Sequence, residues 1–432
     1  MLAVLGFLTV ITFMALIMTK RVSALAALIS VPVVFGLIGG FGVKLAPMIV
    51  NGLRGVAPIA LMLLFAILYF SIMIDVGLFD PLANRVVRMV KGDPVRVITG
   101  TAVLASVISL SGDGTTTLMI CVTAMLPIYK KLGINKVYLV LFIGLPNIIL
   151  NCLPWAGPMP RIMSFFELET SELFNPIIPA MGITILCIWG LAYIIGKREQ
   201  SRLGIIHIDA QTIDEMVAAL NVDKDNCKRL KNFWINLVLT ALVLGVIVAD
   251  MLPVIIVFPI GCALALTINY PAIKEQRKRI VVNAGNIVEV VSLIAAAGVF
   301  MGILTGTKMS DAMAGAFVGI IPATWGPHMA LITAIVSGPG TFFLSNDAFY
   351  FGILPALAKT ATTYGISVAE IGRAGILGQP LHALSPLLPA LYVSLALTEV
   401  EYSELMPVAL PIYTLVMIVF IAAAVLTGAI SF

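Results

Sequence analysis

The sequence has 432 residues, of which 60% are hydrophobic and only 11% are charged, and its mean hydropathy is +1.08. Soluble domains average about 45–50% apolar residues, so a water-soluble fold could not bury this much apolar surface. The formal net charge of +4 is spread over short polar segments and does not form one basic patch, which argues against nucleic-acid binding. The composition predicts an all-α polytopic membrane protein, with the lipid bilayer as its surroundings.

Apolar runs long enough to cross a bilayer recur along the chain. A spanning helix needs about 20 apolar residues, and uncharged runs of this kind cover 57–74, 176–196, 233–249 and 407–430. The chain is apolar from Leu2 onward without a basic segment or a cleavage site, so we expect a first spanning helix there and no removable signal peptide. In total we expect about 10–11 transmembrane helices.

The five cysteines are scattered and show no CxxC or His-paired spacing, so we expect neither a disulfide nor a structural zinc site. Basic residues mark five connections, at 20–21, 85–96, 130–136, 197–231 and 274–279. The positive-inside rule places all five in the cytoplasm. This predicts a multi-pass protein of the cell (inner) membrane with both termini extracytoplasmic.

The segment 94–131 begins and ends at cytoplasmic connections, yet it contains two apolar arms, 95–110 and 115–127. We therefore expect a re-entrant hairpin, which enters the membrane and returns to the same side. The longest polar stretch, 197–232, predicts a cytoplasmic linker with some amphipathic helix. It separates an N-terminal membrane half, 1–196, from a C-terminal half, 233–432.

The two halves share short motifs in the same order. Leu110–Asp113 reads LSGD and Leu344–Asp347 reads LSND, and matches such as Pro154 with Pro386 follow at nearly the same spacing. A steady spacing of this kind indicates an internal duplication. The counterpart of the first hairpin, 327–359, follows one more crossing and so enters from outside, which predicts two inverted-topology repeats.

The tip of the first hairpin is rich in small polar residues. Irregular backbone at membrane depth is tolerated only where protein or a water-filled cavity satisfies it. Glycines permit a tight reversal, and the start of the second arm offers backbone N–H groups at the positive end of a helix dipole. We therefore predict a carboxylate-binding site there, formed by Ser111, Gly112, Gly114, Thr115 and Thr116.

Each predicted tip also carries an ionisable residue, Asp113 in the first and Asp347 in the second. A charge inside a membrane costs at least about 2.5–3.5 kcal/mol, so a functional role is the default expectation. We predict that both aspartates bind a metal cation or a coupling proton.

Two proline-rich helix breaks, at 146–161 and 379–389, are the other predicted site elements, because proline interrupts the helical hydrogen-bond ladder. Arg161 could clamp a carboxylate in bidentate fashion or extend to the interface. His382 could carry a coupling proton or pack as a buried residue. We predict that the two tips and the two breaks converge at one substrate site. Their further predicted substrate-binding residues are Asn151, Gly157, Ser345, Asn346, Gln379 and Ser385.

Four strings carry a family resemblance: LSGDGTTT at 110–117, LPWAGP at 153–158, SNDAFYFGILP at 345–355 and GQPLHALSPLLP at 378–389. With them the chain resembles the citrate–divalent metal:proton symporters, part of a larger ion transporter superfamily. The resemblance implies a homodimeric elevator-type transporter. It would take citrate as a complex with a divalent metal of the Mg or Ca type, together with protons, and would hold no permanently bound cofactor.

Several motif positions depart from the family pattern, namely Ser111, Met159, Pro160, Asn346, Ala390 and Leu391. At Ser111 a carboxylate is lost, and elsewhere hydroxyl groups are lost, which weakens coordination of a hard metal ion. The departures therefore leave the identity of the carboxylate open.

Proton-coupled symport of citrate or a related carboxylate as a metal complex is the leading hypothesis. A sodium-coupled transporter of the free di- or tricarboxylate is the alternative. A membrane-embedded enzyme would need a nucleophile and a base within reach, for which only Asp113, Asp347 and His382 are candidates, and a purely structural or receptor role would leave the polar tips unused. We expect a transporter and not an enzyme.

Overall fold

The computed structural model describes residues 1–432 except 20, 91, 206–213, 215, 216, 219–226, 250, 319–322 and 387. Helices account for all the regular structure in the described part. The helices of the first half are α1 (Leu2–Met18), α2 (Ala24–Ile38), α3 (Leu45–Asp75), α4 (Asp80–Val90), α5 (Pro94–Ser109), α6 (Gly114–Leu132), α7 (Lys136–Leu150), α8 (Met159–Phe166), α9 (Thr170–Leu173) and α10 (Ile178–Leu203). Those of the second half are α12 (Phe233–Val248), α13 (Val254–Asn269), α14 (Ile273–Gly306), α15 (Met309–Val318), α16 (Met329–Phe343), α17 (Leu354–Thr362), α18 (Val368–Ile376), α19 (Gln379–His382), α20 (Pro389–Thr398) and α21 (Tyr402–Leu426).

Within the described residues, five helical stretches are long and apolar enough to span a membrane. They are Gly42–Asp75, Thr170–Leu203, Leu230–Val248, Ile273–Gly306 and Tyr402–Leu426. Each of the four apolar runs predicted from the sequence falls largely within one of them. Five further apolar helices have 10–17 residues, and the total of about 10–11 spans stays a prediction.

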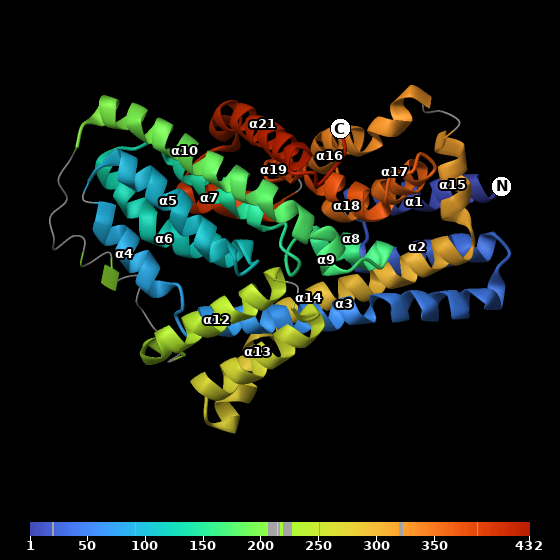
Figure 1. The fold of residues 1–432 in the computed structure, drawn as a ribbon, viewed down its shortest axis with the longest axis horizontal. Coiled ribbons are helices and arrows are strands. Elements are labelled where there is room, and N and C mark those ends of the chain that lie inside the picture. The colour runs from blue at the N-terminus through green and yellow to red at the C-terminus, as the bar shows by residue number, and fades with distance from the viewer. Residues whose placement is uncertain are drawn as a thin grey trace.

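The long helices α3 and α14 lie side by side along the long axis of the molecule (Figure 1). Their contact depends on glycines, because a Cβ on Gly52 would lie 2.8 Å from the Cα of Gly302. Small residues of this kind let two helix backbones approach closely and pack. This pair forms the wall against which the rest of the site is built.

The order of elements after α3 recurs after α14. A short helix, α4 or α15, is followed by a helical hairpin and then by a helix that is interrupted near its end. Figure 1 shows the first hairpin, α5 and α6, and the second, α16 and α17, toward opposite ends of the long axis. This order agrees with a duplication, and the entry of each hairpin from a given side of a membrane stays a prediction.

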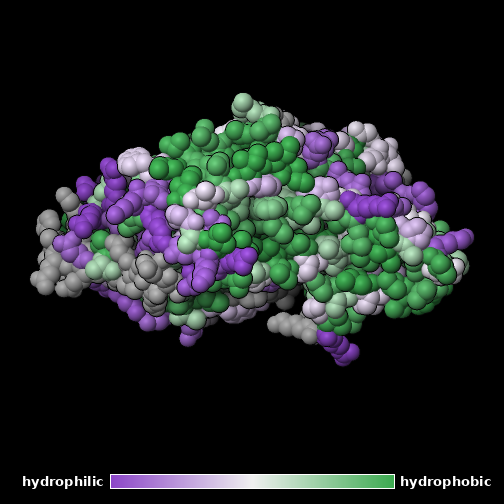
Figure 2. Space-filling model, turned by 90° about the horizontal axis from the view of Figure 1, so that it is seen from below, coloured by the Kyte–Doolittle hydropathy of each residue, from purple (hydrophilic) through white to green (hydrophobic). Residues whose placement is uncertain are grey.

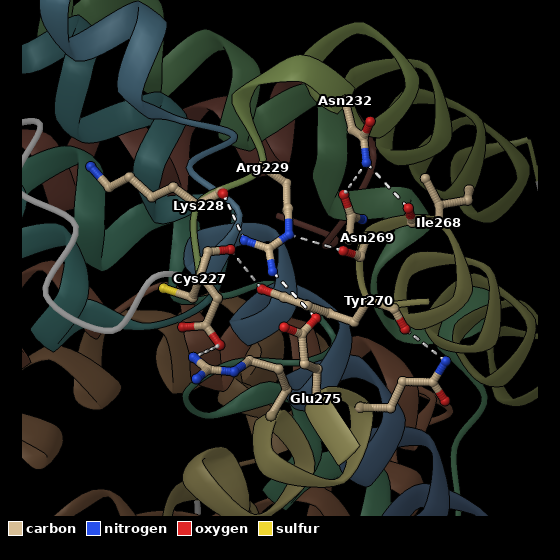
Figure 3. Close-up of polar contacts among 11 residues, drawn as sticks. Cys227, Lys228, Arg229, Asn232, Ile268, Asn269, Tyr270 and Glu275 are labelled. Carbon is tan, nitrogen blue, oxygen red and sulfur yellow. Dashed lines mark hydrogen bonds and ion pairs between the residues drawn. The ribbon is translucent and has the colours of Figure 1, made fainter. Parts of the chain in front are cut away.

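The predicted linker 197–232 is described only in part. Helix α10 continues to Leu203, so the first residues of the linker extend a long apolar helix. Most of 204–226, where an amphipathic helix is expected, lies outside the described residues. The end of the linker is fixed against α13 and α14, as Figure 3 shows.

Arg229 is the centre of this anchor. Its guanidinium donates to the Asn269 carbonyl at 3.2 Å and to Glu275 at 3.3 Å, and it lies 5.0 Å from the centroid of the Tyr270 ring (Figure 3). The Tyr270 hydroxyl donates to the Cys227 carbonyl at 3.0 Å. Beside it, Lys228 pairs with Asp80 of α4 at 2.6 Å. The linker thus connects α13 and α14 to α4, the helix that precedes the first hairpin.

The surface of the molecule has apolar and polar parts. Figure 2 shows hydrophobic side chains over much of the face seen from below, with hydrophilic ones most frequent toward the left end and in smaller groups elsewhere. Exposed apolar side chains are frequent on the spanning helices, for example Trp234 and Leu242 on α12. Such exposure suits a surface that faces lipid.

Candidate functional site

The tip of the first hairpin is a turn between α5, which ends at Ser109, and α6, which begins at Gly114. Gly112 in this turn has φ +77, a conformation that glycine adopts without strain. A Cβ at Gly112 would lie 2.8 Å from the Trp155 ring and 2.9 Å from the Cβ of Ala156. Glycine is required here both for the reversal and for close contact with the helix break.

Asp113 is the N-cap of α6. Its carboxylate accepts hydrogen bonds from the backbone N–H groups of Thr115, at 2.9 Å, and Thr116, at 3.3 Å, and from the Thr116 hydroxyl. The helix N-terminus was expected to offer free N–H groups to an anion, whereas two of them bind the protein's own carboxylate. The tip therefore presents a fixed negative group to any ligand, and this favours a cation.

The first helix break lies between α7 and α8, at 151–158. Trp155 in this break donates its indole N–H to the Leu110 carbonyl at 3.0 Å. Its ring stacks on Phe70, at 5.2 Å between centroids, and meets the edge of Phe258 at 5.3 Å. Trp155 thus ties the first hairpin tip to α3 and α13.

Arg161 in α8 connects the break to the second hairpin tip. Its Nε lies 2.6 Å from the Asp347 carboxylate, and its Nη1 donates to the Gly157 carbonyl at 2.6 Å. Both side chains are largely buried, with exposed fractions of 21% and 15%. Because Asp347 already has this partner, the second tip presents much less free negative charge than the first.

A cavity of about 500 Å³ lies between the first tip, the first break and the α3–α14 wall. Such a volume suits a small-molecule site. Seven of the predicted site residues line it: Ser111, Gly112, Asp113, Thr115, Thr116, Gly157 and Arg161. The wall opposite consists of Phe70 and Ser71 of α3 with Asn286, Glu289 and Leu293 of α14, among others.

The polar residues of α14 are the part of the cavity that sequence reasoning missed. Asn286 and Glu289 are both exposed and stand one helical turn apart. Together with Asn283 they follow a three-residue spacing within an otherwise apolar part of the helix, which places them on one face. An ionisable residue in a spanning helix is itself a functional signal, and that signal could have identified Glu289.

The remaining predicted residues lie outside this lining. The Ser345 hydroxyl accepts from the Ala348 N–H at 3.1 Å, and Gln379 donates to Asn346 at 2.9 Å and to the Tyr350 hydroxyl at 2.7 Å.

The predicted residues of the second break are also bonded within the protein. His382 is buried, with Nδ1 2.7 Å from the Thr341 carbonyl, and the Ser385 hydroxyl donates to the Phe342 carbonyl at 2.7 Å. Gly114 contacts Asn147, and Asn151 packs against Gly157. The residues of the second hairpin and break connect to the cavity through the Arg161–Asp347 pair, whereas Gly114 and Asn151 lie beside residues that line it.

Four of the six positions that depart from the family pattern line one of two cavities. Ser111 and Pro160 line the large one, and the Ser111 hydroxyl accepts from the Asp113 N–H at 3.3 Å. Ala390 and Leu391 line a neighbouring cavity of about 80 Å³ between α6, α7 and α20. Met159 is buried and Asn346 is bonded to Gln379.

Among the described residues, no three His, Cys, Asp or Glu side chains are grouped as a metal site.

Comparison with known proteins places the geometry in a family. Residues 7–378 match the family described as "Citrate transporter". The chain is 51% identical to the "Citrate transporter" of Bacillus subtilis (strain 168), with 100% of each chain covered. It is 45% identical to that organism's "Mg(2+)/citrate complex secondary transporter", covering 100% of this chain and 99% of the relative. Both relatives are named as transporters and not as enzymes, which agrees with the prediction.

The crystal structure of the YdaH transporter of Alcanivorax borkumensis is similar in fold. Its TM-score is 0.58 at 14% sequence identity, and the match covers 89% of this chain and 88% of that chain. At this level of identity the likeness concerns the fold alone.

Proposed function

Since the chain belongs to the citrate transporter family and is a multi-pass membrane protein, we propose that it carries citrate as a complex with a divalent metal ion such as Mg²⁺, in symport with protons. The observation that supports this most strongly is the cavity of about 500 Å³. It brings a fixed carboxylate, Asp113, and a guanidinium, Arg161, to one polar pocket among spanning helices. Such a pair of opposite charges suits a cargo that itself contains a cation and carboxylates.

The metal would act as part of the cargo. Transfer of an ion out of water costs several kcal/mol after relaxation, and a bound divalent cation cancels much of the charge on citrate. The Asp113 carboxylate would face the metal, and the hydroxyls of Ser111, Thr115 and Thr116 would supply hard oxygen contacts. Arg161 would lie beside a citrate carboxylate while it remains paired with Asp347.

We further propose an elevator motion. In this proposal α3 and α14, with α12 and α13, form a fixed wall and the dimer interface, and the hairpins and breaks move against that wall as one body. The cavity lies at the boundary between the two parts, because α3 and α14 supply one side and the first tip and break the other. Localisation in the cytoplasmic membrane, with both termini outside, belongs to the same proposal.

The test is uptake of radiolabelled citrate into proteoliposomes that contain the purified protein. Uptake is measured with Mg²⁺, with Ca²⁺ or with EDTA, under an inward proton gradient or an inward sodium gradient. The proposal predicts uptake that requires both a divalent metal and the proton gradient. Uptake that persists in EDTA and follows sodium would contradict it and would favour a sodium-coupled carrier of the free anion.

A further inference from the structure

Glu289 stands at the middle of the 34-residue helix α14 and faces the first hairpin tip across the cavity. Asn286 lines the same cavity one turn earlier. The carboxylate therefore lies midway along a candidate span, where an unsolvated charge would cost at least about 2.5–3.5 kcal/mol. Exposure to the cavity, which holds other polar groups, provides its solvation.

Two acidic side chains nearby, Asp75 and Asp347, have basic partners, whereas none of the described residues pairs with the Glu289 carboxylate. Asp75, which also faces α14, contacts Arg279 at 3.5 Å and Asn283 at 3.2 Å, and Asp347 pairs with Arg161 at 2.6 Å. Within the described part of the chain, the Glu289 carboxylate has no hydrogen bond or ion pair, and the Ser292 hydroxyl donates only to the Glu289 backbone carbonyl, at 3.1 Å. Its charge therefore acts on whatever occupies the cavity.

The charges that line the cavity sum to a negative field. Asp113 and Glu289 are acidic, and Arg161 is the one basic residue in the described lining. Because Arg161 is already paired with Asp347, it offsets little of that field. The two carboxylates without a basic partner among the described residues belong to opposite sides of the cavity, Asp113 to the hairpin and Glu289 to α14.

Such a field discriminates between forms of the same anion. Free citrate carries about three negative charges near neutral pH, whereas its complex with a divalent cation carries about one. Coulomb repulsion scales with the charge, so each carboxylate disfavours the free anion far more than the complex. Rejection of an unwanted form by a repulsive group is a common source of specificity.

We propose that Glu289 is a specificity-determining residue that favours metal-complexed over free citrate by repelling the free anion. The proposal rests on the proposed function above. It assigns part of this discrimination to the α14 side of the cavity, opposite the carboxylate of Asp113 at the first hairpin tip.

The experiment compares the wild-type protein with Glu289→Gln and Glu289→Asp in proteoliposomes. The kcat/KM for citrate uptake is measured with saturating Mg²⁺ and again in EDTA, and the ratio of the two values is the readout. Where uptake in EDTA is not detected, the detection limit of the assay sets the lower bound of the ratio. Loss of one negative charge in the cavity is expected to lower this ratio at least about tenfold in Glu289→Gln. Glu289→Asp keeps the charge and is expected to keep the ratio near that of the wild-type protein.

Several outcomes would overturn the proposal. An unchanged ratio in Glu289→Gln would do so, as would an equal loss of both activities, which would indicate a structural role. A ratio that stays constant while the pH dependence of uptake disappears would assign Glu289 to proton coupling instead. If Glu289→Gln shows no uptake at all, calorimetric binding of citrate with Mg²⁺ or EDTA to the purified variant supplies the same ratio.

The failure of this proposal and that of the proposed function are distinguishable. A wild-type protein that does not take up citrate with Mg²⁺ refutes the proposed function. A wild-type protein that does so, with a Glu289→Gln variant that rejects free citrate equally well, refutes only the role of Glu289.

Discussion

The two hairpin tips carry an aspartate at corresponding positions, yet the structure gives these aspartates different surroundings. Asp113 caps its own helix, α6, and lines the large cavity. Asp347 precedes a π-helical turn without capping it and pairs with Arg161. A duplicated residue therefore does not imply a duplicated role, because the neighbours decide whether its charge is left for a ligand or is neutralised by the protein.

The largest expected effect comes from breaking the pair at the second tip. Removal of one partner of a largely buried ion pair leaves an uncompensated charge and costs about 3–5 kcal/mol. We expect Arg161→Met and Asp347→Asn each to lower the free energy of unfolding by about this amount and to abolish citrate uptake. Thermal unfolding in detergent and proteoliposome uptake measure the two effects.

The double variant Arg161→Met/Asp347→Asn separates stability from transport. It leaves no unpaired charge, so we expect much of the lost stability to return, with a coupling energy well above that of an exposed pair, about 0–1 kcal/mol. Uptake stays low if Arg161 also faces the cargo. Additive losses of stability in the double variant would contradict the ion pair.

A smaller effect on stability, with a large effect on transport, is expected at the first tip. Asparagine is as good an N-cap as aspartate, whereas alanine costs about 1 kcal/mol. Asp113→Asn should therefore unfold at nearly the wild-type temperature, and Asp113→Ala should unfold earlier. In both variants the metal-dependent uptake should fall at least about tenfold, since each substitution removes the Asp113 carboxylate from the cavity. Wild-type uptake in Asp113→Asn would show that capping is the whole role of Asp113.

The smallest expected effect concerns a contact outside the membrane-spanning segments. Glu399, in the connection between α20 and α21, lies 2.8 Å from Lys130 near the end of α6 and 3.1 Å from Lys136 at the start of α7. Hydrogen bonds from Lys130 and then Lys136 lower the pKa of Glu399. A lowered pKa in the folded state means that the contact stabilises the fold above the ordinary glutamate pKa and is lost as pH falls through the lowered value.

Glu399→Gln should therefore unfold at a slightly lower temperature than the wild-type protein at neutral pH. The difference between the two should shrink as the pH falls through the acidic range and as salt is added, because the pair is exposed. Differential scanning fluorimetry across pH gives this comparison. A difference that is independent of pH would show that the ion pair does not contribute.

The first hairpin and its tip could be predicted from the sequence, because glycine, aspartate and threonine have strong local preferences for turns and helix caps. Gly112 has the positive φ that such a reversal needs, and Asp113 with Thr115 and Thr116 forms a cap within a few residues. Long apolar runs likewise predicted the spanning helices, because the length of a span follows from bilayer thickness.

Other parts of the site depend on contacts between distant segments and could not be predicted in the same way. The Arg161–Asp347 pair joins residues separated by 186 positions, and no local pattern indicates which partner an arginine takes. The wall residues Asn286 and Glu289 were not predicted as site residues, because they lie on the unbroken helix α14, whereas the sequence prediction was based on hairpin tips and broken helices. The backbone N–H groups at the first tip were predicted to bind a ligand, but the Asp113 carboxylate is closer in the sequence and accepts hydrogen bonds from two of them.

We propose that the cavity at the first hairpin tip binds citrate together with its metal. Isothermal titration calorimetry of the purified protein tests it directly, with Mg²⁺–citrate and with citrate in EDTA titrated into the wild-type protein and into Asp113→Asn. We expect clear binding of Mg²⁺–citrate to the wild-type protein, with weaker binding in EDTA and at least about tenfold weaker binding of the complex to Asp113→Asn. Equal affinity for the complex in both proteins would contradict it.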